Sequence, residues 1–218
     1  MRNNPQPERL KVKSFPVGPL QCNCSIIACK ETGEAAIIDP GGDADLIINL
    51  IQEYKLKPKF LLHTHAHFDH IIATRAVKEA TGAKIYLHKA DKMLYENLSR
   101  QGQLFGLKID APLPIDEYLE DESEIVIGKV KAKILHTPGH TPGSACFCLN
   151  DRDSLLFSGD TLFARSIGRT DLWGGSFDDI IKSISKRLFV LDDETRVIPG
   201  HGPDTTIWTE KRENPFFQ

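Results

Sequence analysis

The chain alternates short apolar runs with segments whose apolar residues recur every three to four positions. The short runs, which predict strands, lie at residues 10–16, 23–30, 34–39, 59–64, 84–88, 124–127, 130–136, 144–149, 154–158 and 195–198. The segments with helical spacing lie at residues 43–54, 69–81, 89–100 and 177–190. Strands come in antiparallel clusters and helices interrupt each half. We therefore expect an α/β (α+β) fold in which two sheets are covered on the outside by helices.

Two further segments interrupt this pattern. The D-P-G-G sequence at residues 39–42 breaks the chain between a predicted strand and a predicted helix. Residues 101–113 predict a loop in which Leu104 and Phe105 look exposed. Because the sequence contains no repeat, low-complexity tract or obvious linker, we expect residues 1–218 to form a single domain.

Composition and charge narrow the class of protein. The 218 residues are 40% hydrophobic and 26% charged, as in a globular protein with a sizeable core. The formal net charge of −3 gives no electrostatic reason to expect nucleic-acid or anionic-membrane binding. No apolar run approaches the ~18 residues that a membrane-spanning helix needs. The N-terminus also lacks the apolar core of a secretory signal, so we expect a cytoplasmic protein.

The five cysteines agree with that compartment. Their number is odd, and they are dispersed through runs that predict strands. We expect buried thiols, with Cys22 and Cys24 as the one pair to consider as reactive.

The strongest chemical signal is T-H-A-H-F-D-H at residues 64–70. It places four potential metal ligands within six residues: His65, His67, Asp69 and His70. In a loop that leaves a strand, alternating residues point the same way, so His65 and His67 can hold one ion. Asp69 and His70 lie at a predicted helix start and can hold a second ion nearby. Imidazole nitrogens and a carboxylate oxygen suit zinc, and this alternation disfavours a merely polar, histidine-rich surface loop.

Three more candidates each follow a predicted strand and a glycine. They are His140 in T-P-G-H-T, Asp160 in F-S-G-D-T and His201 in I-P-G-H-G. Glycine permits positive φ and close approach of the backbone, so such a turn can aim a side chain into a shared cleft. Each residue alone is more often a polar turn residue. Together with residues 64–70, the three would complete two coordination shells.

These motifs resemble the metallo-β-lactamase superfamily, in the same order across nearly the whole chain. The resemblance implies a four-layer αββα sandwich with two divalent metal ions at one edge. It also implies the ligand roles: His65, His67 and His140 for one ion, Asp69, His70 and His201 for the other, and Asp160 as the bridge. We expect zinc, with iron or manganese as alternatives because mixed histidine and carboxylate sites accept them.

Within the superfamily the chain is most similar to the glyoxalase II group, the hydroxyacylglutathione hydrolases. The similarity is carried by G-D-T-L-F-A-R-S-I-G-R-T-D at residues 159–171 and by T-P-G-H-T-P-G-S. It implies hydrolysis of a small-molecule thioester such as S-lactoylglutathione by a metal-bound hydroxide. Asp69 would be a catalytic ligand that also orients the water. A thiolate is a reasonable leaving group, so no dedicated general acid is required.

The chain also departs from that group. Only 17 residues follow His201, so we expect the helical C-terminal domain that helps to bind glutathione to be absent. Arg169 falls where the group has a basic residue that touches substrate, which predicts a substrate-binding role. Asp171 falls where the group has a tyrosine. Pairing of Arg169 with Asp171 is therefore an equally open interpretation.

Other functions and residues stay open. A mononuclear-iron persulfide dioxygenase of the same superfamily, which uses the His65, His67, His140 and Asp160 side of the site, carries a similar G-R-T-D run. The best-known dizinc β-lactamases use a cysteine where Asp160 stands, and the acidic charge balance disfavours a nuclease. The sequence fixes neither the physiological thioester nor the oligomeric state. We expect His63, His88 and His136 to be structural or to hydrogen-bond to a metal ligand. Phe105 and Trp173 either line the mouth of a substrate site or are buried in a core.

Overall fold

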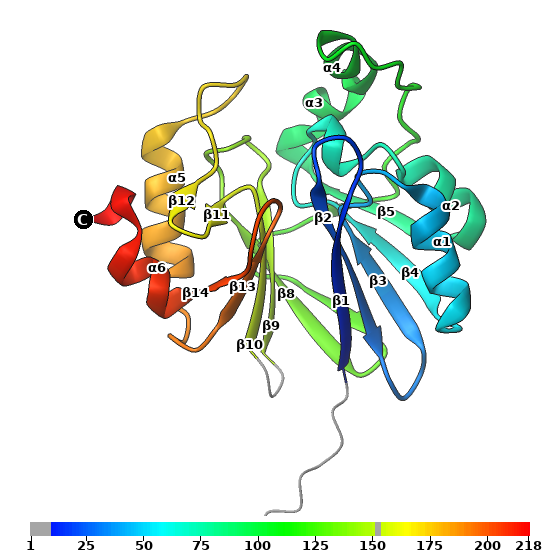
Figure 1. The fold of residues 1–218 in the computed structure, drawn as a ribbon, viewed down its shortest axis with the longest axis horizontal. Helices are drawn as coiled ribbons and strands as arrows, with labels where there is room; N and C mark the ends of the chain where they lie inside the picture. The colour runs from blue at the N-terminus through cyan, green and yellow to red at the C-terminus, as the bar shows by residue number, and fades with distance from the viewer. Residues whose placement is uncertain (1–9, 151–153) are drawn as a thin grey trace, which may run out of the picture.

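Two six-stranded sheets form the centre of the structure, a computed structural model that describes residues 10–150 and 154–218 (Figure 1). The first sheet has the order β1-β2-β3-β4-β5-β6. Its strands are β1 (Leu10–Val17), β2 (Cys22–Cys29), β3 (Glu34–Ile38), β4 (Lys57–Leu62), β5 (Lys84–His88) and β6 (Glu117–Leu119). The second sheet has the order β14-β13-β10-β9-β8-β7. Its strands are β7 (Glu124–Ile127), β8 (Val130–His136), β9 (Ala145–Asn150), β10 (Ser154–Gly159), β13 (Arg196–Pro199) and β14 (Thr205–Thr206).

Helices cover the outer face of each sheet, which gives four layers (Figure 1). On the first sheet lie α1 (Ala44–Glu53) and α2 (Thr74–Thr81), and near its upper end α3 (Lys92–Glu96) and α4 (Leu98–Leu104). On the second sheet lie α5 (Phe177–Ser183), continued by the π-helical turn η3 (Ile184–Leu188), and α6 (Ile207–Glu213). Short 3₁₀ turns are η1 (Phe68–His70), η2 (Lys89–Asp91) and η4 (Pro215–Phe217), and a small ribbon pairs β11 (Leu162–Phe163) with β12 (Ser166–Ile167). This arrangement confirms the predicted αββα sandwich.

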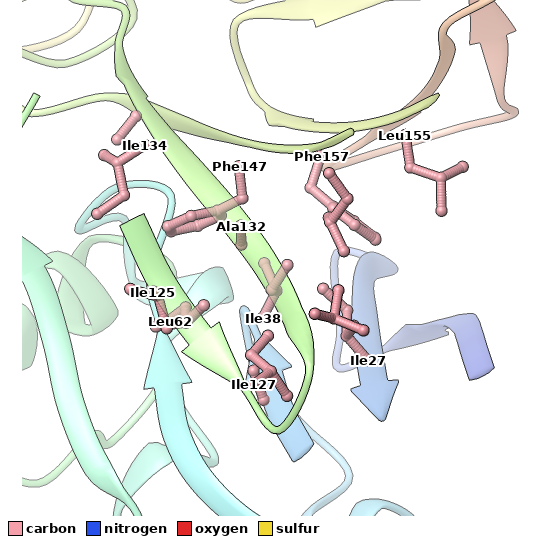
Figure 2. Packing of buried hydrophobic residues seen from close by; sticks show 14 of the residues in the cluster. Ile27, Ile38, Leu62, Ile125, Ile127, Ala132, Ile134, Phe147, Leu155 and Phe157 are labelled. Atoms are coloured by element: carbon pink, nitrogen blue, oxygen red, sulfur yellow. The ribbon is translucent and has the colours of Figure 1, made fainter. Parts of the chain in front are cut away.

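The main core lies between the two sheets. Ile27, Ile38 and Leu62 of the first sheet face Phe147 and Phe157 of the second, and all five are at most 2% exposed (Figure 2). Separate apolar clusters fill the space between each sheet and its helices. Strands with both faces covered bury nearly every side chain, which explains why β2 is buried along almost its whole length although Asn23 and Ser25 interrupt its apolar residues.

Strand direction brings several loops to one edge of the sandwich. Both β8 and β10 run antiparallel to β9, and β13 runs parallel to β10. The loops that follow β8, β10 and β13 therefore leave from the same edge of the second sheet. Two backbone hydrogen bonds tie that edge to the first sheet, from the Ala145 amide to the Thr64 carbonyl (2.8 Å) and from the Asn23 amide to the Gly200 carbonyl (2.7 Å).

Several predicted boundaries differ from the structure. The strand predicted at 59–64 ends at Leu62, and the helix predicted at 69–81 is a 3₁₀ turn followed by α2 from Thr74. The loop predicted at 101–113 begins within α4, which continues to Leu104. The short elements β6, β14 and α6 were not predicted because each has too few residues to show a period. No helix in the described part of the chain is long and apolar enough to cross a membrane.

Candidate metal centre

The T-H-A-H-F-D-H segment turns sharply after β4 and folds its polar side chains inward. The turn η1 carries Asp69 and His70, and His67 immediately precedes it. His65 is 1% exposed, His70 is 0% exposed and Asp69 is 7% exposed. Buried ionisable groups at this density need partners, because a desolvated charge or lone pair is costly.

All seven predicted residues meet at this edge of the sandwich. The segment after β4 brings four of them, and the loops after β8, β10 and β13 bring His140, Asp160 and His201. Three overlapping clusters each hold their ligand atoms within 4.8 Å of one another: His65-His67-His140, His65-His70-Asp160 and Asp69-His70-His201. The first and third clusters are the two predicted triads, and the second joins them.

Asp160 lies between the two triads. Its Oδ1 is 3.4 Å from His70 Nε2, and its Oδ2 is 3.5 Å from His140 Nε2 and 3.8 Å from His201 Nε2. Asp69 Oδ2 lies 3.1 Å from His201 Nε2. One carboxylate thus faces members of both triads, which is the geometry that a bridging ligand needs.

Burial and mutual repulsion keep two of the imidazoles neutral. Burial, then repulsion from His140, lowers the pKa of His67 to about 3, and burial also lowers the pKa of His65 well below its ordinary value. Burial opposes ionisation of Asp160, but attraction to His70 and then to His140 outweighs that cost and lowers the Asp160 pKa. Neutral imidazoles and ionised carboxylates are the protonation states that bind cations.

Two of the predicted ligand histidines are oriented by acceptors behind them. His70 Nδ1 is 2.9 Å from Asp39 Oδ2, and His140 Nδ1 is 2.8 Å from the Arg169 carbonyl oxygen. A carboxylate and a carbonyl only accept, so each Nδ1 carries the proton and each Nε2 offers its lone pair to the centre. Asp39 also accepts hydrogen bonds from the amide and hydroxyl of Thr64 at 2.8 and 2.6 Å, which fix its carboxylate.

Asp91 supports the same loops from another direction. It is 0% exposed and accepts hydrogen bonds from the Ala66 amide, the Thr141 hydroxyl and the Gly143 amide, at 2.9, 2.8 and 2.6 Å. It therefore ties the loop of His65 and His67 to the loop of His140. The sequence reasoning missed both Asp39 and Asp91. The one available signal for Asp39 was an acidic residue directly after a buried strand and before Pro-Gly-Gly.

Two features of the structure test whether a cation fits here. Within residues 10–150 and 154–218, His65 Nε2, His70 Nε2 and Asp160 Oδ1 are buried and have no hydrogen-bond partner. Such atoms are rare in folded proteins, and a bound cation would satisfy all three. The backbone at Gly200 also approaches closely, because a Cβ there would lie 2.2 Å from Asp160 Oδ1 and 2.8 Å from His70 Cε1. The residues present therefore fit a metal centre.

The centre opens into a cavity of about 560 Å³, which we call the main cleft. Its floor includes the predicted ligands His67, Asp69, His140, Asp160 and His201. Apolar side chains line the rest of it: Leu20, Phe68, Leu94, Leu104, Phe105, Leu172 and Trp173. Phe105 is 59% exposed and Trp173 is 52% exposed, so both line the mouth of the cleft and neither belongs to a core.

The other predicted polar residues take varied places. Arg169 lines the main cleft, and its Nε and Nη2 each donate to Asp171 at 2.8 Å. His63 is fully buried with its Nε2 3.3 Å from the Thr74 hydroxyl, beneath the ligand loop. His88 and His136 stack with ring centroids 4.0 Å apart and belong to none of the ligand clusters formed by the described residues. All five cysteines are buried thiols, and Cys22 Sγ lies 3.4 Å from His70 Nδ1.

Comparison with known proteins agrees with this geometry. The sequence profile of the metallo-β-lactamase superfamily matches residues 17–201, a span that contains all seven predicted ligands. The chain belongs to the metallo-β-lactamase superfamily. Among curated relatives of this superfamily, it is 44% identical over 211 residues to hydroxyacylglutathione hydrolase GloC of Haemophilus influenzae, which covers 95% of this chain and 98% of that protein.

Two solved structures show the same architecture. BLEG-1, described as a B3 metallo-β-lactamase, has a TM-score of 0.88 and 40% identity over 95% of this chain and 99% of its own. TTHA1623 in a di-iron-bound form has a TM-score of 0.85 and 40% identity over 94% of this chain and 99% of its own. The family and the ligand clusters together support a metal-binding hydrolase.

Asp39 gives a direct test of the hydrogen bonds behind the ligands. We expect Asp39→Asn to weaken metal retention by about 10–100-fold, because the neutral amide polarises and orients His70 less strongly. The measurement is metal content against increasing chelator concentration. Asp45, an exposed acid at the start of α1, supplies the control Asp45→Asn, which should release metal as the unaltered protein does. If both variants retain metal equally well, Asp39 does not stabilise the metal centre.

Proposed function

We propose that this chain is a metal-dependent thioesterase of the hydroxyacylglutathione type that holds two divalent ions. The observation that carries the proposal is the pair of triads joined by Asp160 on the floor of an open cleft. The similarity to GloC supports the thioester as substrate class. The donor set of imidazoles and carboxylates suits zinc, while the di-iron form of TTHA1623 makes iron the main alternative.

The ions and the protein would contribute different parts of the reaction. Two divalent ions held by these residues would lower the pKa of a water molecule and polarise the scissile carbonyl. Asp69 lines the main cleft beside His201, so its carboxylate can accept a hydrogen bond from the attacking water and orient it. Asp160 holds the two triads in register. The leaving thiolate needs no protonated residue, since thiols have pKa values of about 8.5.

Arg169 is our proposed substrate contact within the main cleft. Its guanidinium group offers fixed donors to a carboxylate or amide, and Asp171 holds that group in one orientation. The Arg169 carbonyl oxygen also accepts from His140 Nδ1. One residue, Arg169, would therefore both bind substrate through its side chain and orient His140 through its backbone carbonyl. The buried cysteine thiols support a cytoplasmic location, where thiols stay reduced.

A substrate panel tests the proposal. Metal-replete protein should hydrolyse S-lactoylglutathione and simpler thioesters, lose that activity on chelation and regain it when zinc or iron is returned. The panel includes a chromogenic cephalosporin, because BLEG-1 is described as a B3 metallo-β-lactamase, and glutathione persulfide with oxygen consumption recorded. Cephalosporin cleavage without thioester cleavage would make the chain a β-lactamase. Oxygen consumption by an iron-loaded form without thioester cleavage would make it a persulfide dioxygenase.

A further inference from the structure

A second cavity opens from the side of the main cleft. This side groove, of about 360 Å³, is lined by Met93, Asn97 and Arg100 and by four residues that also line the main cleft. The shared residues are Leu94, Gln101, Leu104 and Trp173. Because one set of side chains borders both spaces, the groove continues the cleft away from the metal ligands.

The walls of the groove come from two parts of the chain at the same end of the molecule. One wall is formed by α3 and α4, and Trp173 lies in the segment between β12 and α5, which rises over the same end of the sandwich (Figure 1). The exposed fractions are 80% for Leu104, 58% for Met93 and 52% for Trp173. Apolar side chains gathered around a cavity at these exposures mark a binding surface, since isolated exposed apolar residues have no such arrangement.

The helical wall is fixed to the ligand loop. Gln101 donates to the Ala66 and Leu94 carbonyls at 2.9 and 2.8 Å and accepts from the Phe68 amide at 3.1 Å. The Phe105 ring packs on Phe68 with centroids 4.7 Å apart. Since Ala66 and Phe68 flank the ligand His67, the groove keeps a set position relative to the reacting centre. A group bound in it would be held at a set distance from the scissile bond.

Charge distinguishes the groove from the main cleft. Among the described residues that line the two cavities, the guanidinium groups are Arg100 and Arg169. Arg169 is in a bidentate ion pair with Asp171, whereas Arg100 is exposed at the side groove, whose described lining contains no carboxylate. A ligand that lies along the groove would meet apolar walls and one cation.

We propose that the side groove binds one arm of the thioester substrate, and that this arm is a bulky apolar chain or ring that ends in a carboxylate facing Arg100. This proposal rests on the thioesterase activity proposed above and specifies its substrate class. Burying the apolar arm removes the exposed surface of Leu104 and Trp173 from water. Either the acyl or the thiol side of the thioester can carry such an arm.

Two substrate series test the proposal, one with a fixed small thiol and varied acyl groups, the other with a fixed acetyl group and varied thiols. The groove binds the arm on one side of the thioester, so one of the two series should show a preference. In that series, kcat/KM should be at least about tenfold higher for an apolar arm that ends in a carboxylate than for a short arm. An amide-capped arm of equal length should lie between them. The effect should appear in KM, because the arm binds equally in the ground and transition states.

Three variants locate the effect. Arg100→Gln should lower the preference for carboxylate over amide cap by roughly fivefold, as an exposed ion pair allows, and Arg100→Lys should retain most of it. Trp173→Ala should lower the preference for long over short apolar arms. Lys89→Gln, an exposed cation outside the groove, is the control and should change neither ratio. Metal content shows that each variant is folded and loaded.

The outcomes separate this proposal from the one on which it rests. If no thioester is hydrolysed, the proposed function fails. If S-lactoylglutathione is hydrolysed but neither series prefers the carboxylate-ended apolar arm, the groove proposal is overturned and the thioesterase stands. If Trp173→Ala alters the oligomeric state while both preferences stay intact, the groove belongs to an interface between copies of this chain and the proposal is also overturned.

Discussion

Replacing Asp160 with alanine is expected to remove both metal ions and to lower thioester hydrolysis by a factor on the order of 10²–10³ or more. The carboxylate faces His70 through Oδ1 and faces His140 and His201 through Oδ2, so it contributes to both triads. Without it, the five histidines of the clusters are left with Asp69 as the one carboxylate that balances the charge of two divalent ions. Elemental analysis of protein purified without chelator should approach two metals per chain before the change and fall towards zero after it.

The control for this experiment is an acid that lies near the cleft but outside the clusters. Asp171 is exposed and paired with Arg169, so Asp171→Ala should keep full metal content. If Asp160→Ala loses one ion and keeps the other tightly bound, Asp160 is a terminal ligand of a single site. A stable value near one metal per chain in the fully active unaltered protein would contradict the dinuclear mechanism itself.

Gly200→Ala is expected to lower activity at least about a hundredfold, although it adds a single methyl group and removes no predicted ligand. The new Cβ would lie 2.2 Å from Asp160 Oδ1 and 2.8 Å from His70 Cε1. Neither side chain can move away easily, because His70 is 0% exposed and the Asp160 side chain is 12% exposed. One of the two ligands must therefore leave its position, and metal content should fall together with activity.

A neighbouring glycine offers a matched control. Gly202 has a φ of +78°, and a Cβ there would meet nothing within 4 Å. Gly202→Ala should therefore lower the thermal midpoint modestly through backbone strain and leave metal content unchanged. If Gly200→Ala retains both metals and most of its activity, the loops after β10 and β13 have more freedom than the close approach at Gly200 indicates.

The residues of the candidate metal centre could be found from the sequence because their signal is local. His65, His67, Asp69 and His70 fall within six residues, and each later ligand follows a strand and a glycine. Asp39 and Asp91 lack such a signal. Their partners include Thr64, which is 25 residues from Asp39, and Thr141, which is 50 residues from Asp91, and the fold alone brings these groups together.

The layered fold was predictable from hydrophobic pattern, whereas its short elements were not. Mainly apolar segments such as β2 and β10 predict buried strands. By contrast, β6 and β14 have only three and two residues, and they form strands because they pair with neighbouring strands. The end of α4 falls within the segment predicted as a loop, and Gly102 in it has low helical propensity. In the structure Gly102 lies against Ile109, where a Cβ would come within 2.6 Å of that side chain, so tertiary packing decides its conformation.

The division of the ligands between the two halves of the chain has a consequence for biosynthesis. A ribosome releases the segment of His65 to His70 early, together with most of the first sheet, and releases His201 much later, after β13. Each triad takes one residue from a loop of the second sheet, His140 after β8 and His201 after β13. Neither triad is complete until the second sheet has docked on the first, so metal loading and completion of the fold would be one cooperative event.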